Sequence, residues 1–585
     1  MLLRHPFAPR DTERPGTPYR IPSFLADAAV LLGALALFAL IARVGAGAFV
    51  RFVPPHEVPT VSLDPRYLPY YAARSTLRMF LALGASLLFS VLYGYIAAKS
   101  RRAEQVLIPL LDILQSVPVL GFLSITVTGF IALFPGSLLG LELASLFAIF
   151  TSQAWNMTFS FYQSLRTVPR ELDEAVTLYR LPRWQRFLRL EVPAATIGLL
   201  WNAMMSFGGG WFFVAASEAI SVLNQSYTLP GIGSYVTAAV EAQNIPALLC
   251  ALVAIAVVIM LVDQLFWRPL VAWGDRFKLE RSAAAETPHS WVLDILRSAR
   301  LPSLLAGIFA PVRETLGNTC TWLFPARVPR RAMAPGNRHD DRLYHALLVL
   351  LAIGLGAWGM HFILTEVGLR EIAQVLLMGL ATFARVALLV VLSTVIWVPI
   401  GVAIGFTPRL ARLLQPVVQF LASFPANFLF PFATIVFIKA GISLNIGGIV
   451  LMSLGAQWYI LFNTIAGAIS IPNDLREMTR TLGVHGWRLW QSLIIPGIFT
   501  AWVTGGITAS GGAWNASIIA ETVSWGNTTL TAYGLGAYIA NATKGGDWPR
   551  IALGVGFMCV FVVGLNRCVW WRLYHLAETK YRLGS

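Results

Sequence analysis

Charged side chains are scarce in this sequence. Of its 585 residues only 12% are charged, while 56% are hydrophobic and the mean hydropathy is +0.66. In an ordinary soluble domain about 25% of the residues are charged. So small a charged fraction excludes an ordinary soluble protein and predicts that most of the chain lies in lipid.

Cysteine and nucleotide-binding motifs are also sparse or missing. The four cysteines, Cys250, Cys320, Cys559 and Cys568, form no CxxC pair, so neither a metal site nor a disulfide framework is expected. The eight histidines are scattered, which disfavours a membrane enzyme with clustered catalytic groups. No GxxxxGK[ST] sequence for binding phosphate occurs. We expect no catalytic residue, no metal and no cofactor.

Long apolar runs are abundant instead. A membrane-spanning helix needs about 20 apolar residues, and about twelve runs meet this length. They are 25–49, 76–98, 106–134, 141–165, 196–220, 247–267, 343–365, 376–406, 413–438, 446–469, 497–520 and 551–571. The runs 106–134 and 413–438 contain several prolines, so we expect them to be kinked or partly re-entrant. The predicted fold class is an all-α, polytopic membrane protein.

The basic residues give this protein an orientation. If the spans alternate, most of the 44 Lys and Arg residues fall in segments on the same side of the membrane. The net charge of +15 then follows the positive-inside rule and places both termini in the cytoplasm. A nucleic-acid partner would need a folded basic domain, and none is visible. We expect contact with membrane lipid and no nucleic-acid binding.

The chain repeats itself. Residues 169–193, PRELDEAVTLYRLPRWQRFLRLEVP, align without a gap with residues 472–496, PNDLREMTRTLGVHGWRLWQSLIIP. Matches on either side extend the repeat, among them Arg78 with Arg385, Asn156 with Asn463, Trp211 with Trp514 and Glu218 with Glu521. We place a four-residue deletion in the second copy after Asn463. Each copy holds an even number of spans, so the two are parallel repeats.

The repeat divides the chain into four segments. We predict a cytoplasmic tail at 1–24, a first repeat at 25–275, a basic cytoplasmic linker at 276–342 and a second repeat at 343–585. Part of the linker mixes Trp, Leu and Ile with Arg. It is either a set of amphipathic helices on the inner leaflet or a tether without specific function, and the sequence leaves both open.

The repeated polar segment resembles the EAA loop of the permease subunits of ABC importers. In that family, a Glu-Ala pair precedes a glycine and then an apolar-x-apolar-Pro end. The residues that carry the resemblance, together with a repeated tryptophan, are Glu174, Ala175, Trp184, Pro193, Glu477, Gly483, Trp487 and Pro496. The first copy departs from the family by Arg180 in place of glycine, and the second lacks both alanines.

This resemblance implies a function and partners. It implies the type I fold of an ABC importer permease in a bacterial inner membrane, in which the two loops form coupling helices. The expected partners are two ABC ATPase subunits at the cytoplasmic face and a periplasmic or lipid-anchored substrate-binding protein. The alternatives are an ordinary connecting loop and, for the whole chain, a twelve-helix secondary transporter of the major facilitator type.

The span after each loop is polar and rich in glycine. Such glycines either let helices pack closely or break helices beside a cavity. On the second interpretation, the candidates that line a translocation path are Asn202, Ser206, Trp211, Thr508, Ser510, Trp514 and Asn515.

Glu218 and Glu521 lie near the outer ends of these spans, each before a Gly-x-Gly-x-Tyr. This segment resembles the nitrate, sulfonate and taurine class of ABC permeases, which implies a small anionic substrate such as nitrate, bicarbonate or a sulfonate. A buried charge in a membrane is usually paired, so we expect Arg78 to pair with Glu218 and Arg385 with Glu521. Alternatively, both arginines reach toward the headgroups.

Overall fold

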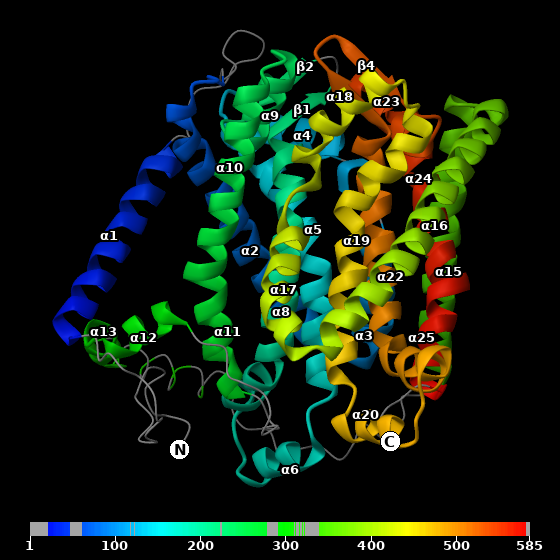
Figure 1. Ribbon diagram of the computed structural model, residues 1–585. Coiled ribbons are helices and arrows are strands. Elements are labelled where there is room, and N and C mark those ends of the chain that lie inside the picture. The colour runs from blue at the N-terminus through cyan, green and yellow to red at the C-terminus, as the bar shows by residue number, and fades with distance from the viewer. Residues whose placement is uncertain are drawn as a thin grey trace.

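The computed structural model describes residues 22–46, 61–116, 119–121, 123–222, 225–277, 290–308 and 338–580, with single positions between 310 and 321. The tail predicted at 1–24 therefore lies outside the described residues except for 22–24, and Cys320 lies outside them as well. Residues 278–289 and 322–337 of the predicted linker are also outside. The described chain is helical apart from two short hairpins (Figure 1).

Helices coincide with the predicted apolar runs in both halves. The first half contains α1 (Ser23–Ala46), α2 (Leu68–Lys99), α3 (Arg101–Ser116), α4 (Leu123–Leu133), α5 (Leu139–Arg166), α8 (Val192–Glu218) and α10 (Ile245–Val262). The second contains α15 (Arg338–Glu366), α16 (Leu369–Phe406), α17 (Pro408–Ser423), α18 (Phe430–Ala440), α19 (Leu444–Ser470), α22 (Ile495–Ala520) and α24 (Trp548–Leu565). Among the described residues, eight helical stretches are long and apolar enough to cross a membrane. The all-α, polytopic fold is confirmed.

Two predicted spans are broken at matched places. The run 106–134 divides into α3 and α4 around the short helix η3 (Val119–Gly121). The run 413–438 divides in the same way into α17 and α18 around η7 (Ala426–Phe428). Proline explains part of this break, because Pro425 directly precedes η7 and has no N–H to continue a helix.

The duplication extends to the finest backbone details. Wide, π-helical turns occur at η4 (Phe187–Glu191) and η5 (Asp263–Trp267) in the first half. The second half has them at the matched positions, η8 (Trp490–Ile494) and η9 (Asn566–Trp570). Because such turns are rare, their recurrence shows that the two repeats share one fold.

The register of α5 corrects one part of the sequence alignment. A Cβ atom on Gly94 of α2 would lie 2.9 Å from Phe161 of α5. A Cβ atom on Gly401 of α16, the match of Gly94, would lie 2.9 Å from Thr464 of α19. Phe161 therefore corresponds to Thr464, at an offset of 303 residues. The shorter offset thus applies throughout α5 and α19.

The four-residue difference thus lies before α19, in the connection that follows α18. Ala440 corresponds to Leu133 at the longer offset and Leu444 to Leu141 at the shorter one, so the second copy has three residues where the first has seven. The match of Asn156 with Asn463 is wrong, because it used the longer offset. The residue that corresponds to Asn156 is Tyr459.

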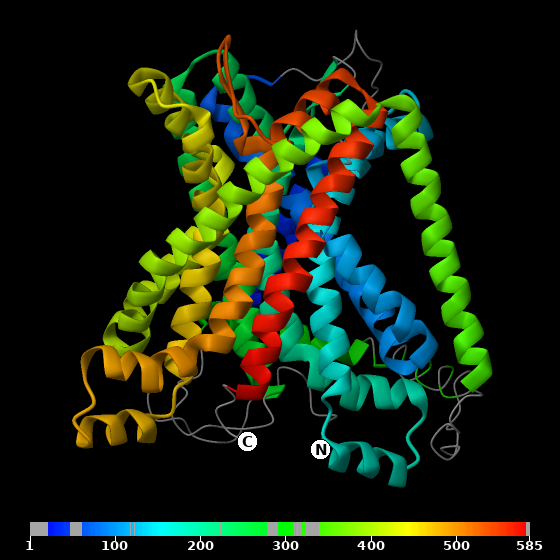
Figure 2. The ribbon, with the colours of Figure 1, turned by 90° about the vertical axis from the view of Figure 1, so that its right-hand side faces the viewer.

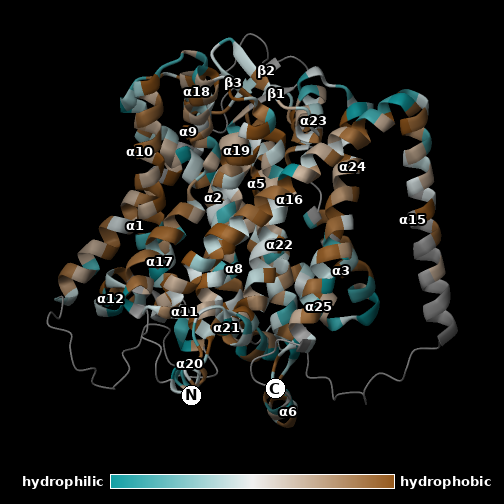
Figure 3. Cartoon of the chain, turned by 45° about the vertical axis from the view of Figure 1, so that its right-hand side comes forward, coloured by the Kyte–Doolittle hydropathy of each residue, from teal (hydrophilic) through white to brown (hydrophobic). Residues whose placement is uncertain are grey.

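The helices form two packed groups. In the first half, α5 packs between α2 and α8, and in the second α19 packs between α16 and α22. Figure 1 shows α1 and α15 on opposite flanks of these groups. Figure 3 shows hydrophobic residues along the middle of the spanning helices and more hydrophilic residues toward their ends, as a membrane protein requires.

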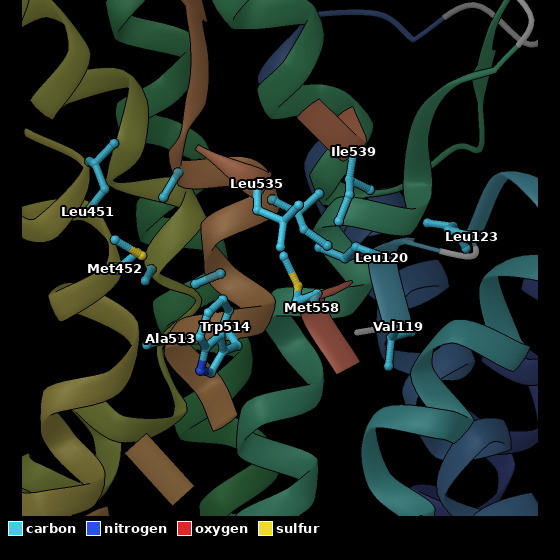
Figure 4. Close-up of a cluster of buried hydrophobic side chains, with 14 of the residues drawn as sticks. Val119, Leu120, Leu123, Leu451, Met452, Ala513, Trp514, Leu535, Ile539 and Met558 are labelled. Carbon is cyan, nitrogen blue, oxygen red and sulfur yellow. The ribbon is translucent and has the colours of Figure 1, made fainter. Parts of the chain in front are cut away.

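Each half inserts its broken span into the core of the other. Figure 4 shows Val119 and Leu120 of η3 close to Leu535 and Met558 of the second half, and all four belong to one buried cluster. Conversely, Phe428 of η7 is buried in the cluster formed mainly by the first half. This exchange joins the two repeats through their apolar interiors.

Candidate functional site: two inner loops and two buried charge clusters

The repeated loops fold alike. The first contains α6 (Arg170–Leu178) and α7 (Arg183–Arg186) and leads into η4; the second contains α20 (Asn473–Thr481) and α21 (Gly486–Leu489) and leads into η8. Pro169 and Pro472 directly precede α6 and α20. Figure 2 shows α6 and α20 on the same face of the molecule and well separated from each other.

Both loops expose apolar side chains. Leu178 and Tyr179 are 82% and 81% exposed at the end of α6, and Leu482 is 68% exposed at the matched end of α20. Glu174 and Glu477 are exposed as well. Large apolar groups gathered at an exposed helix end are typical of a surface that binds another protein.

The other predicted loop residues are placed as follows. Ala175 is half-buried on α6, while Pro193 and Pro496 lie in the first turns of α8 and α22. Trp184 is half-buried and its Nε1 donates to Thr321 Oγ1 at 2.9 Å. Trp487, its counterpart, is 66% exposed. The linker residue Thr321 therefore contacts the first loop.

The turn after each loop helix requires a left-handed residue at the position where the EAA loop has a glycine. Arg180 and Gly483 both have a positive φ, of 50° and 65°. In each loop the next residue closes the turn, with Leu181 N donating to Val176 O and Val484 N to Thr479 O. A left-handed residue costs about 1–2 kcal/mol unless it is glycine, so Arg180 holds a strained place that Gly483 occupies freely.

Ion pairs connect the first loop to a spanning helix. Arg186 pairs with Asp173 of α6 and donates through Nε to Glu191 Oε1 at 3.0 Å. Lys99, the last residue of α2, places its Nζ 2.5 Å from the same Glu191 oxygen. Glu191 is buried, so these contacts link the loop helix rigidly to the inner end of α2.

The second loop makes the same connection with different chemistry. Arg476 occupies the place of Asp173, and its guanidinium lies 4.4 Å from the ring centre of Phe406, which occupies the place of Lys99. Leu489 and Ile494 replace Arg186 and Glu191 and pack in an apolar cluster with Phe406. Burial and the neighbouring Arg480 lower the pKa of Arg476.

At the opposite end of the molecule, each half buries an arginine and a glutamate in contact. Arg385 Nη1 donates to Glu521 Oε1 at 2.6 Å, and Arg78 Nη1 donates to Glu218 Oε1 at 2.7 Å. Neither pair faces water, because all four side chains are buried. Neither glutamate is therefore a free carboxylate.

Backbone and hydroxyl groups complete both clusters in the same way. Ser75 and Thr382 donate to Glu218 and Glu521, at 2.5 and 2.8 Å. The N–H groups of Gly233 and Gly536 donate to the other carboxylate oxygens, at 2.7 and 2.8 Å.

The Gly-x-Gly sequence has a steric cause. A Cβ atom on Gly231 or Gly534 would lie 2.2 Å from the carboxyl group of Glu218 or Glu521. A Cβ atom on Gly233 would lie 2.6 Å from the backbone of Ala215. The glycines therefore allow the chain to pass directly over each buried glutamate.

The first cluster contains two charges that the sequence reasoning missed. Glu142 accepts from Arg78 Nε at 2.5 Å and also pairs with Arg74. The second half has Asn445 in the place of Glu142, and its Oδ1 accepts from Arg385 Nη2 at 2.8 Å. Arg74 and Glu142 do not recur in the second copy, so a search for repeated residues could not find them.

The predicted path residues fall into two groups. Trp211 and Trp514 are buried in hydrophobic clusters, and Ser206 and Ser510 are buried too. The amide of Asn202 and the hydroxyl of Thr508 bond to carbonyls of their own helices.

Asn515, the last of these candidates, connects the two halves. Its Oδ1 accepts from Val119 N of η3 at 3.1 Å. On the other side, Asn427 Nδ2 of η7 donates to Phe212 O of α8 at 3.1 Å. These bonds hold each broken span against the glycine-rich helix of the opposite half.

Two hairpins lie at the end of the molecule opposite to the loops (Figure 1). Strand β1 (Ala219–Val222) pairs antiparallel with β2 (Gln225–Thr228), and β3 (Thr522–Trp525) pairs with β4 (Thr528–Thr531). The first hairpin packs on α23 (Leu535–Gly545) of the second half, and the second packs on α9 (Ile232–Glu241) of the first. Gly526 N donates to Val240 O at 3.2 Å across this boundary.

These features define a polytopic membrane protein of two like halves, each with a loop that presents an apolar surface at one face. Among the described residues, no group of His, Cys, Asp or Glu could hold a metal ion. Residues 90–266 and 396–576 both match the family described as binding-protein-dependent transport system inner membrane component. The chain belongs to this family, with the family domain present twice, which disfavours the secondary-transporter alternative.

Curated relatives come from several anion transport systems. The chain is 28% identical over 195 residues to the nitrate import permease protein of Synechococcus elongatus. It is 27% identical over 192 residues to the bicarbonate transport system permease protein of the same species. Each match covers 33% of this chain and 66% of the relative. The putative aliphatic sulfonates transport permease protein of Escherichia coli is 34% identical over 113 residues, 19% of this chain and 41% of the relative.

Proposed function

We propose that this protein forms the translocation pathway of an ATP-driven ABC importer for a small anion. The two repeated loops carry the proposal, since they lie on one face and each ends in exposed apolar side chains. The anionic substrate is supported by relatives named for nitrate, bicarbonate and sulfonates.

The partners follow from the same surfaces. Two loops call for two ATPase subunits, or one fused pair, at the cytoplasmic face, where the basic segments place both termini. A periplasmic or lipid-anchored binding protein delivers the anion at the outer face. ATP hydrolysis belongs to the ATPase, and the linker between the repeats lies on the cytoplasmic side.

The loops transmit ATPase movement through contacts already formed. In the first half the Arg186–Glu191–Lys99 ion pairs carry motion from α6 to α2. In the second half the packing of Arg476 on Phe406 takes their place. The Arg78–Glu218 and Arg385–Glu521 pairs stabilise the outer ends, so that the two helix groups move as rigid units.

One aspartate substitution in each loop, at its exposed apolar end, tests this function. The double variant Leu178→Asp with Leu482→Asp places charges where the ATPase would dock. Leu576→Asp is the matched control, because Leu576 is also an exposed leucine, on α25 (Trp571–Lys580), outside the loops. An ABC ATPase subunit that co-purifies with the wild-type protein is co-expressed with each variant.

We expect the double variant to lose the co-purifying ATPase and the ATP-dependent uptake of nitrate, bicarbonate or an alkanesulfonate into proteoliposomes that contain the binding protein. The control should retain both. Uptake that persists in the double variant, or that needs a proton gradient instead of ATP, would refute the proposal.

A further inference from the structure

A single tyrosine lies between the two glycine-rich helices. Gly209 of α8 and Gly512 of α22 occupy matched positions in the two halves. A Cβ atom on Gly209 would lie 3.1 Å from the hydroxyl oxygen of Tyr459, and one on Gly512 would lie 3.6 Å from its ring. The Tyr459 side chain therefore reaches both matched helices and lies close to the pseudo-two-fold axis that relates parallel repeats.

The first half has no equivalent of this ring. The residue that corresponds to Tyr459 is Asn156, whose Oδ1 lies 3.4 Å from Gln115 Nε2. An asparagine is too short to reach the opposite glycine-rich helix as tyrosine does. The contact that Tyr459 makes with both glycine-rich helices therefore has no counterpart from the first half.

A small cavity adjoins Tyr459 at the boundary between the halves. Its volume is about 30 Å³, more than the 10–15 Å³ or so that one water needs. Helix α8 of the first half and helices α17 and α19 of the second half surround it. The lining residues are Met204, Met205, Gln419, Ala422, Ser423, Tyr459 and Phe462.

The polar groups of this lining are neutral. They are the hydroxyls of Tyr459 and Ser423 and the amide of Gln419, whose Nε2 lies 3.4 Å from Asp263 Oδ1 outside the lining. The lining itself includes no Lys or Arg. The hydroxyls of Tyr459 and Ser423 can donate hydrogen bonds to an anion without forming an ion pair. Burying a charge that lacks a counter-charge is costly, and the cost rises with the charge. The lining therefore suits a singly charged anion better than a doubly charged one.

We propose that Tyr459 is the gate of the translocation path and that its hydroxyl donates a hydrogen bond to a singly charged anion as it passes. A path between the halves must run between α8 and α22, and the Tyr459 ring occupies that passage. Gly209 gives the hydroxyl its space, since a Cβ atom there would lie 3.1 Å from it, while Gly512 lets α22 approach to ordinary contact with the ring. This inference rests on the proposed function and names the side chain that controls passage.

Three variants in proteoliposomes test the gate. Tyr459→Ala removes the ring, Tyr459→Phe removes only the hydroxyl, and Trp458→Ala truncates the neighbouring aromatic on the same helix. Each is purified with its ATPase, and retained size and ATPase binding show that it is folded. Nitrate movement is measured with and without ATP, and sulfate serves as the doubly charged comparison.

We expect Tyr459→Ala to leak nitrate without ATP at least tenfold faster than the wild type, while Trp458→Ala stays closed. Tyr459→Phe should stay closed but lose about fivefold in ATP-driven nitrate uptake, because one hydrogen bond is lost. Tyr459→Phe carries the test by itself if the alanine variant does not fold. Unchanged nitrate uptake by Tyr459→Phe, or an equal leak in Trp458→Ala, would overturn the inference.

The wild type separates this inference from the proposed function. If the wild type imports nitrate and the Tyr459 variants show the same leak and the same uptake as the wild type, only the gate is contradicted. A wild-type protein that imports no anion in the presence of ATP contradicts the proposed function itself.

Discussion

Removing one buried carboxylate should cost more in the second half than in the first. The two variants are Glu521→Gln and Glu218→Gln, which keep the size of the side chain and remove its charge. Without Glu521, the buried Arg385 keeps only neutral acceptors, Asn445 and the carbonyl of Tyr533. Without Glu218, Arg78 keeps its two bonds to Glu142, a carboxylate that it shares with Arg74.

These partners set the expected magnitudes. A buried ion left without its counter-charge destabilises a protein by about 3–5 kcal/mol, which is the cost expected for Glu521→Gln. Glu218→Gln leaves one carboxylate for two buried arginines, but Arg78 keeps this charged acceptor, so its cost should be about 1–3 kcal/mol, the value for a lost hydrogen bond to a charged group. The second-half variant should therefore be the less stable by about 2 kcal/mol.

The assay is the midpoint of thermal unfolding of the detergent-solubilised protein, followed by the loss of the monodisperse peak in size-exclusion chromatography. The double variant Arg385→Gln with Glu521→Gln should recover most of the lost stability, since it removes both charges. An exchange of charges in the first half would be a poor test, because Arg78→Glu places an acid beside Glu142. Equal midpoints for the two single variants would refute this account of the clusters.

The backbone and the ion pairs yield three further predictions. Arg180→Gly should raise the unfolding midpoint by relieving about 1 kcal/mol of left-handed strain, and a lowered midpoint would contradict this. Gly534→Ala should destabilise by about 1–3 kcal/mol through overpacking, whereas Gly511→Ala, with open space around its added Cβ, should not; similar losses would refute the steric argument. Lys99→Met should reduce the stimulation of ATPase activity by the binding protein severalfold, and the remaining activity should depend less on salt concentration. ATPase assays at low and high salt measure both effects, and an unchanged salt dependence would contradict the prediction.

The sequence alone predicts the parts of this protein that are repeated or periodic. Apolar length locates the spanning helices, and the repetition of residues 169–193 locates the two inner loops. The contact of Arg78 with Glu218 follows the same logic, because a charge in a membrane needs a partner and both residues recur. Each of these predictions depends on composition or repetition, which an unaligned sequence shows directly.

Features present in only one half could not be predicted in this way. Glu142 and Arg74 appear only in the first copy, and Tyr459 has a different side chain at its match, Asn156. The sequence alignment puts the four-residue deletion after Asn463, because Asn156 and Asn463 match at the longer offset. The packing of α5 on α2 shows instead that the deletion lies before α19. The burial of Trp514 likewise depends on the three-dimensional packing of helices distant in sequence.

Where one half has a buried ion pair and the other does not, both charged residues of the pair are replaced. Arg74 and Glu142 at the outer end are matched by Ala381 and Asn445, so that both charges of the pair are absent together. At the loop end, the buried contact of the first half is formed by Lys99, Arg186 and Glu191, which are matched by Phe406, Leu489 and Ile494. The half-buried Asp173, a further partner of Arg186, is matched by Arg476. A buried charge is tolerated only with its partner, so such contacts are replaced as units. The matched connection between loop and spanning helix therefore depends on ion pairs in one half and on apolar packing in the other, and high salt should weaken only the first.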